Sequence, residues 1–333
     1  MANSFAKIKM PKCARPPKPQ KAEKLDGPKK LTLGQRILRE LQRNWILYVM
    51  MIPVIAYFIL YHYAPMYGIQ IAFKKFNSKL GIMGSKWVGF DHFERFFSSY
   101  NFKNLLRNTL GISLYNLAVS FPLPIIFALL LHYLDIKPLK KFVQMTSYAP
   151  HFLSTVIISS ILILFCSKNG FFNIIGSFFG AEKADLLAKP EYFKHIYVWS
   201  DVWASVGWSA IIYIAALSGV DQQMHEAAIV DGASKLQRML HIDLPSIIPT
   251  IVMLLILKMG GVMSVGFEKA FLLQNDLNLR SSQIISTYVY ELGLLKADYS
   301  FSTAVGLFNN VINVTLMVLA NTFSKKVLKE SLW

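Results

Sequence analysis

Six apolar stretches constrain what this chain can fold into more than any other feature of its sequence. A helix rises about 1.5 Å per residue, so a run of about 20 apolar residues can cross the hydrocarbon core of a bilayer. Backbone amides and carbonyls must be paired inside a bilayer, so the spans should be helical. The expected fold class is an all-α membrane protein with six transmembrane helices, at residues 45–63, 110–131, 148–165, 195–217, 247–267 and 303–319.

Composition agrees with a membrane protein that crosses the bilayer several times. The chain is 54% hydrophobic and 16% charged, with a mean hydropathy of +0.39, which is unusual for a soluble protein. Its net charge of +16 is uneven, because residues 1–44 hold twelve Lys or Arg against Glu23, Asp26 and Glu40. A basic segment before a first span favours retention in the cytoplasm and contact with anionic lipid over nucleic-acid binding.

The ends of the chain differ from its apolar centre. Residues 1–30 are rich in Pro and Lys and are predicted to be a disordered cytoplasmic tail. Residues 31–44 alternate apolar and basic side chains at helical spacing, which predicts an amphipathic helix on the membrane surface or, alternatively, an extension of the first span. Residues 45–322 form the predicted six-span domain, and residues 323–333 a second tail. An even number of spans puts this tail on the same side as the first.

A hydrophilic stretch at residues 221–249 separates the fourth and fifth spans. Asp221 is a plausible N-cap for a short helix at 222–230, and Gly232 should end that helix. A second short helix is predicted at 234–242, ending before Pro245. An ordinary amphipathic loop is the plain alternative. The ordered pattern comprises Glu226, Ala227, Ala228, Asp231, Gly232, Ala233, Leu244, Pro245 and Pro249.

This pattern resembles the EAA loop of bacterial ABC importer permeases. The resemblance implies a type I permease fold in which the loop is a coupling helix that docks in a groove of a separate ATPase subunit. Residues 65–73 and 87–93 resemble the narrower subgroup that takes up oligosaccharides and polysaccharides. His225 and Met239 depart from the common loop pattern, which leaves partner specificity open.

The resemblance also implies the other parts of an importer. These are a second homologous permease, two ATPase subunits, an extracellular solute-binding protein and a saccharide substrate, in a bacterial cytoplasmic membrane with both termini inside. Outside the tail, Lys and Arg are not enriched on the inner side, so this orientation depends on the tail and the resemblance. The chain has no G-x-x-x-x-G-K-[ST] loop, so ATP and Mg are expected in the partner ATPase, and the chain itself is predicted to hold no cofactor or metal and not to be an enzyme.

Several residues within or beside the spans are candidates for the substrate path. An ionisable side chain at membrane depth is costly unless it faces a cavity, the bundle interior or another charge. Asparagine side chains can hydrogen-bond sugar hydroxyls or hold helices together, and tryptophan can stack on a sugar or anchor a span at the interface. Two prolines in residues 121–124 should kink the second span beside this path. The candidates are Lys258, Asn309, Asn313, Trp203 and Glu268.

Two other classes of function remain open. Lys258 and Glu268 could couple ions in a secondary transporter of a polar solute, although six spans without evident inverted repeats are few for that class. A passive assembly subunit would need no polar residue at membrane depth. The importer permease is the main prediction.

Overall fold

The computed structural model describes Gly34 and residues 40–327. The chain divides into two compact units, Met1–Pro65 and Met66–Trp333. The tail at residues 1–30 lies outside the described residues, as does most of the predicted surface helix at 31–44. Of that helix, residues 40–43 are helical, and an ion pair of 3.2 Å joins Arg43 Nη2 to Glu40 Oε1.

The first unit consists of the first predicted span. Helix α2 (Trp45–Phe58) continues as the π-helix η1 (Ile59–Tyr63) and the short helix α3 (Ala64–Met66). Pro53 lies inside α2 and removes one backbone donor there without ending the helix. The helical prediction for residues 45–63 is confirmed.

Six helical runs of the described residues are long and apolar enough to cross a membrane, as predicted. Two of the expected spans, the third and the fifth, include residues that lie outside the observed helical runs. The third run begins at Thr155, because a 3-10 turn, η3 (Ala149–Phe152), precedes the N-cap Ser154. The fifth run ends at Met259, before the Gly260–Gly261 turn. The runs are Trp45–Phe73, Tyr100–His132, Thr155–Phe178, Pro190–Leu217, Lys235–Met259 and Tyr299–Lys326.

The second span breaks where its prolines lie. Helix α6 (Tyr100–Ser120) ends at Phe121, and α7 (Pro122–His132) begins at the next residue. Each proline lacks the N–H that would continue the hydrogen-bond ladder, so the chain restarts with a proline in the first turn, where no such bond is needed. The predicted interruption of this span is confirmed.

Helix α11 (Pro190–Leu217) is central to the second unit. It packs against α6, α7, α8 (Lys137–Tyr148) and α14 (Leu244–Met259). A Cβ at Gly207 would lie 2.4 Å from the carbonyl oxygen of Ser147, so glycine is required where α11 meets α8. Buried apolar side chains of α7, α11 and α14 form one core: Ile125, Ala128, Leu129, Ala210, Tyr213, Leu217 and Ile247.

A small folded element follows the first span. It comprises the 3-10 helix η2 (Tyr67–Phe73), the antiparallel strands β1 (Lys74–Lys75) and β2 (Lys86–Trp87), and the helices α4 (Gly81–Gly84) and α5 (Asp91–Phe97). The Phe73 and Trp87 rings stack with centroids 5.8 Å apart. The two sequence strings at 65–73 and 87–93 therefore pack together through these rings.

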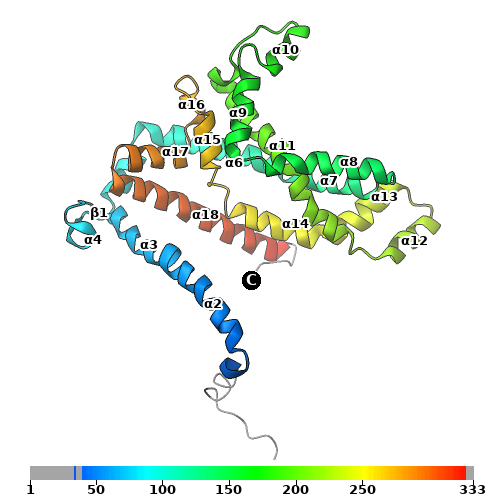
Figure 1. Cartoon of the computed structure of the whole chain (residues 1–333), viewed down its shortest axis with the longest axis horizontal. Helices are drawn as coiled ribbons and strands as arrows, with labels where there is room; N and C mark the ends of the chain where they lie inside the picture. The colour runs from blue at the N-terminus through cyan, green and yellow to red at the C-terminus, as the bar shows by residue number, and fades with distance from the viewer. Residues whose placement is uncertain (1–33, 35–39, 328–333) are drawn as a thin grey trace, which may run out of the picture. The chain divides into compact units, whose positions relative to one another are not determined.

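The remaining elements complete the second unit. Helix α18 continues to Val327, so the first residues of the predicted tail at 323–333 belong to the last helix. Figure 1 shows α12 and α13 at one end of this unit, and β1, α4 and α17 at the opposite end. These elements are α9 (Thr155–Cys166), α10 (Phe171–Phe178), η4 (Leu186–Ala188), α12 (Gln222–Val230), α13 (Lys235–Arg238), η5 (Met239–Asp243), α15 (Phe267–Leu273), α16 (Leu279–Ser282), α17 (Ile285–Tyr290), η6 (Glu291–Leu295) and α18 (Tyr299–Val327).

Candidate functional site

The hydrophilic loop between α11 and α14 begins with the predicted helix. The Asp221 side chain accepts a hydrogen bond of 2.9 Å from the Gln223 amide, which caps α12. Gly232 has a φ of +77°, and beyond it the Ala233 amide donates to the Ala228 carbonyl at 2.8 Å. This left-handed turn pairs a carbonyl that the helix end would otherwise leave free. Both the cap and the glycine turn match the prediction.

The second half of the loop differs from the prediction. Ser234 and Gln237 form a reciprocal capping box for α13, but the helix does not end before Pro245. It widens into the π-helix η5 and runs on into α14, with Pro245 in the first turn of α14. The wider turn lets the helix pass a residue that lacks an N–H, and such π segments are common where a helix serves a function.

A buried polar network ties the loop to the bundle. Asp243, in η5, has 0% of its surface exposed, and His225 of α12 has 6%. His225 Nε2 lies 3.0 Å from Asp243 Oδ1, and the Tyr133 hydroxyl donates to Asp243 Oδ2 at 2.5 Å. We call these three residues the Asp243 network. Burial, followed by the hydrogen bond to Asp243, raises the pKa of Tyr133 above its ordinary value, so the hydroxyl keeps the proton that it donates.

The segment that follows α7, which contains Tyr133 and Asp135, contacts the loop at two further points. Lys235 Nζ lies 2.6 Å from Asp135 Oδ2, and the Arg238 guanidinium lies 5.9 Å from the centre of the Tyr133 ring. The hydrogen bond and charge of Lys235 hold the pKa of Asp135 below its ordinary value. Because both partners of the Lys235 pair are exposed, it contributes little stability and mainly favours one orientation.

The rest of the loop presents an accessible surface that is both acidic and apolar. Glu226, Ala227, Asp231 and Gly232 are exposed, and so is Pro245, whereas the other predicted loop residues, Ala228, Ala233 and Leu244, are half-buried. Large apolar side chains lie beside them, with Val230 88% exposed and Leu236 61% exposed. A surface that mixes exposed apolar groups with a few charges is typical of a protein–protein contact.

Lys258, near the end of the fifth helical run, lines two cavities. Its Nζ donates to the Ser120 hydroxyl at 2.6 Å, at the break between α6 and α7. One cavity of about 400 Å³ is lined by Lys258 together with Phe121 and Pro124 of the kinked span. A second cavity, of about 180 Å³, is lined by Lys258, Asn116 and Asp201. The structure thus brings together the ionisable residue and the kink that the sequence analysis singled out separately.

A polar cluster that the sequence analysis missed adjoins the smaller cavity. Asn116 Nδ2 donates to Asp201 Oδ2 at 3.1 Å, and Lys269 Nζ lies 3.6 Å from Asp201 Oδ1 and 2.9 Å from the Tyr197 carbonyl. Glu268, which precedes Lys269 and was a predicted candidate for the substrate path, is exposed in the first turn of α15. The available sequence signal was Asp201, a carboxylate within the fourth predicted span.

The two predicted asparagines of α18 are both buried but differ in their contacts. Asn313 Oδ1 accepts from the Met263 amide at 2.7 Å, and its Nδ2 donates to the Ser264 hydroxyl at 2.9 Å. These contacts hold the turn after α14 against α18, as the helix-packing alternative predicts. Asn309 Oδ1 is buried, and no donor among the described residues reaches it. A role in the substrate path stays a prediction for both.

Replacing Asn313 with leucine is expected to lower the stability of the assembled protein. The Met263 amide and the Ser264 hydroxyl would each lose a partner, at a cost of about 1–2 kcal/mol. The measurement is the thermal unfolding midpoint of the purified protein in detergent, with Asn309→Leu as the matched control. Unchanged stability combined with lost uptake in Asn313→Leu would instead place this side chain in the path.

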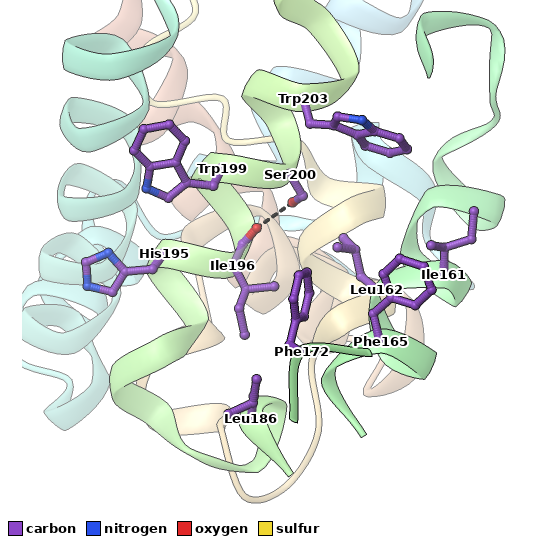
Figure 2. A pocket seen from close by; sticks show the side chains of 10 residues that line it. All are labelled: Ile161, Leu162, Phe165, Phe172, Leu186, His195, Ile196, Trp199, Ser200 and Trp203. Carbon is purple, nitrogen blue, oxygen red and sulfur yellow. Dashed lines mark hydrogen bonds between the residues drawn. The ribbon is translucent and has the colours of Figure 1, made fainter. Parts of the chain in front are cut away.

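Trp203 lies away from Lys258. It lines an apolar cavity of about 520 Å³ with Leu162, Phe165 and Phe172. Figure 2 shows its ring on the side of Phe165 and Ile161, whereas Trp199 and His195 point to the other side. The hydroxyl of Ser200, one of the few polar groups here, is already bonded to the Ile196 carbonyl at 2.5 Å. The cavity offers few partners for sugar hydroxyls, and stacking on Trp203 remains a prediction.

Comparison with known proteins identifies the family. Residues 96–329 match the family described as "Binding-protein-dependent transport system inner membrane component". The chain belongs to this family. The permease is 45% identical over 300 residues to the polygalacturonan/rhamnogalacturonan transport system permease protein YteP of Bacillus subtilis, an alignment that covers 90% of this chain and 94% of YteP. It is 40% identical to protein LplB of the same species, with 93% of this chain and 98% of LplB covered.

Solved structures give the same result for the fold. The permease superposes with a TM-score of 0.81, at 37% identity, on a chain of a bacterial ABC transporter involved in import of the acidic polysaccharide alginate, covering 88% of this chain and 99% of that one. A second structure of a bacterial alginate ABC transporter, in complex with an alginate pentasaccharide-bound periplasmic protein, matches with a TM-score of 0.82, at 36% identity, with 89% and 100% covered. The type I permease fold predicted from the loop is therefore confirmed.

Family membership decides between the classes of function left open by the sequence. The protein is a multi-pass membrane protein and a permease subunit of a binding-protein-dependent ABC importer. This result favours the importer over an ion-coupled secondary transporter and over a passive assembly subunit. The loop whose pattern suggested the family is also the part that the Asp243 network fixes at one end of the second unit.

Proposed function

We propose that this permease imports an anionic oligosaccharide by alternating access, driven by separate ATPase subunits that dock on the loop at residues 221–249. The observation that carries the proposal is the geometry of this loop. It is a capped helix, a glycine turn and a second helix, held to the bundle by buried groups while its acidic and apolar residues stay exposed. Such a surface suits a partner groove that has basic and apolar walls.

The residues that meet the ATPase in this proposal are those of the predicted pattern and two exposed apolar residues beside them. Glu226 is exposed and free to pair with a basic side chain of the partner. Val230 and Leu236 supply apolar area that water would otherwise cover. Gly232 keeps the two helices at a fixed angle because its left-handed backbone is cheap only for glycine. Ala227, Ala228, Asp231, Ala233, Leu244 and Pro245 complete the element.

The remaining parts of the transporter are proposed from the family. They are a second homologous permease, two ATPase subunits that bind ATP and Mg, and an extracellular solute-binding protein. The docking loop faces the cytoplasm in this arrangement, and both termini lie on that side. Within the second unit, α12 lies at one end and the element that contains β1 and α4 lies at the opposite end. This placement supports the proposal, because the element that contains β1 and α4 would then face the binding protein.

The substrate proposal rests on the cation beside the kinked span. A lysine amine that lines two cavities can pair with the carboxylate of an acidic sugar, and the kinked span and Asn116 supply polar groups beside it. The similar transporter structure is described as an importer of an acidic polysaccharide, and YteP is named for polygalacturonan and rhamnogalacturonan. These relatives support an oligosaccharide that carries carboxylates.

Uptake into reconstituted vesicles tests the proposal. The permease and the proteins that co-purify with it are placed in vesicles, and a fluorescent alginate oligosaccharide and a neutral oligosaccharide of equal length are supplied with the binding protein. We expect uptake of the acidic sugar only when the ATPase and ATP are present. Uptake that needs an ion gradient and no ATPase would contradict the importer, and equal uptake of the neutral sugar would contradict the anionic substrate.

A further inference from the structure

We propose that the Asp243 network passes the movement of α12 into two membrane spans at once, α7 and α14. This inference rests on the proposed function, because it takes α12 as the helix that the ATPase moves. Its three members come from three different elements: His225 lies in α12, Asp243 in η5, and Tyr133 directly after α7. His225 departs from the common loop pattern of the importer family, and the sequence pattern includes neither Asp243 nor Tyr133.

The contacts of Asp243 make it the shared partner of the network. The Tyr133 hydroxyl donates a hydrogen bond of 2.5 Å to Asp243 Oδ2, whereas His225 Nε2 lies 3.0 Å from Oδ1 in an ion-pair contact without hydrogen-bond geometry. A carboxylate with no exposed surface is costly unless its oxygens are paired, so movement of either neighbour away from Asp243 is opposed. The two neighbours are therefore held at fixed positions on either side of one buried group.

Few other contacts hold α12 to the bundle. His225 is the buried residue of α12, and among the described residues α12 has no extensive packing against another helix. Apart from the chain at its two ends, the side chain of His225 is therefore the main buried contact that α12 makes among the described residues. A force applied to the exposed face of α12 reaches Asp243 through this side chain.

The two helices that leave the network meet again at the candidate substrate path. Helix α7 runs back to Pro122 from the residue before Tyr133, and α14 runs forward to Met259 from the residue after Asp243. Near their far ends the Ser120 hydroxyl accepts a hydrogen bond of 2.6 Å from Lys258 Nζ, beside both cavities. Between these two points, side chains of both helices pack in one core with α11. A shift of Asp243 and Tyr133 together would thus move α7 and α14, the two helices that meet beside Lys258.

The tests are single substitutions measured in vesicles that contain the whole transporter. His225→Leu removes the nitrogen that meets Asp243, and Tyr133→Phe removes only the hydroxyl and keeps the ring near Arg238. His225→Gln returns an N–H donor of similar reach. The matched control for loss of a hydroxyl is Tyr192→Phe, because Tyr192 is 42% exposed and lies in the first turn of α11, outside the loop. Three quantities are measured: co-purified ATPase, ATP hydrolysis, and alginate oligosaccharide taken up per ATP hydrolysed.

We expect His225→Leu and Tyr133→Phe to retain the ATPase and its hydrolysis but to lower uptake per ATP by about fivefold or more, as for loss of a typical coupling between sites. His225→Gln should recover most of the ratio, and Tyr192→Phe should keep it. If His225→Leu does not assemble, Tyr133→Phe decides alone. A native ratio in Tyr133→Phe, or an equal loss in Tyr192→Phe, would overturn the inference. If instead the unaltered transporter takes up sugar without ATP, the proposed function fails and not only this inference.

Discussion

Replacing Gly232 with valine is expected to leave the permease in the membrane but to lower ATP-driven uptake by about 100-fold. The backbone of Gly232 has a φ of +77°, where a β-branched residue is strained by about 1–3 kcal/mol. No atom lies within 4 Å of a Cβ built at this position, so the effect is one of backbone angle and not of crowding within the chain. A changed turn would tilt α12 relative to α13, and the exposed face would no longer fit its partner groove.

The measurement is co-purification of the ATPase together with uptake in reconstituted vesicles. Gly232→Asn is the matched control, because asparagine adopts the left-handed conformation more readily than other residues and should keep much of the activity. Glu226→Ala is expected to weaken ATPase binding for a different reason, loss of a charged contact that is worth on the order of 2 kcal/mol or more at a desolvated interface. Native binding and uptake in both Gly232→Val and Glu226→Ala would remove the docking assignment of this loop.

Replacing Lys258 with methionine is expected to lower uptake of an anionic oligosaccharide by about 10- to 100-fold while ATPase binding stays native. Methionine keeps the length of the side chain but removes the cation beside both cavities, and a charge-assisted hydrogen bond is worth about 1.5–3 kcal/mol. The hydrogen bond to the Ser120 hydroxyl would also be lost. Because Lys258 lies at the end of α14 opposite to the loop, ATP hydrolysis per assembled complex should change little.

The measurement compares uptake of acidic and neutral oligosaccharides of equal length. Lys258→Arg, which keeps the charge, should retain more uptake of the acidic sugar than Lys258→Met. Lys183→Met serves as a surface control, since Lys183 is an exposed lysine outside the spans. An equal fall for both sugars in Lys258→Met would mean that the side chain acts through helix packing, and native uptake of both would remove Lys258 from the path.

The local features of this protein could be predicted from the sequence alone. The six apolar runs, the cap at Asp221, the left-handed Gly232 and the break before Pro122 all depend on residues within about one helical turn, or on the length of one apolar run. Backbone hydrogen bonds and φ preferences act over that same distance, so a sequence pattern predicts them directly. The family could also be predicted from the sequence, because the spacing of the residues within the loop is a local pattern.

Only the tertiary structure decided which polar groups meet inside the bundle. Tyr133 and Asp243 are 110 residues apart, and Asn313 reaches the Met263 amide across 50 residues. The sequence marked Asn313, Lys258 and Glu268 as costly groups in or beside apolar runs, but it did not show that Asn313 holds two segments together or that Lys269 pairs with Asp201. A buried polar group needs a partner, yet which partner it finds depends on how several helices pack, and no local pattern records that choice.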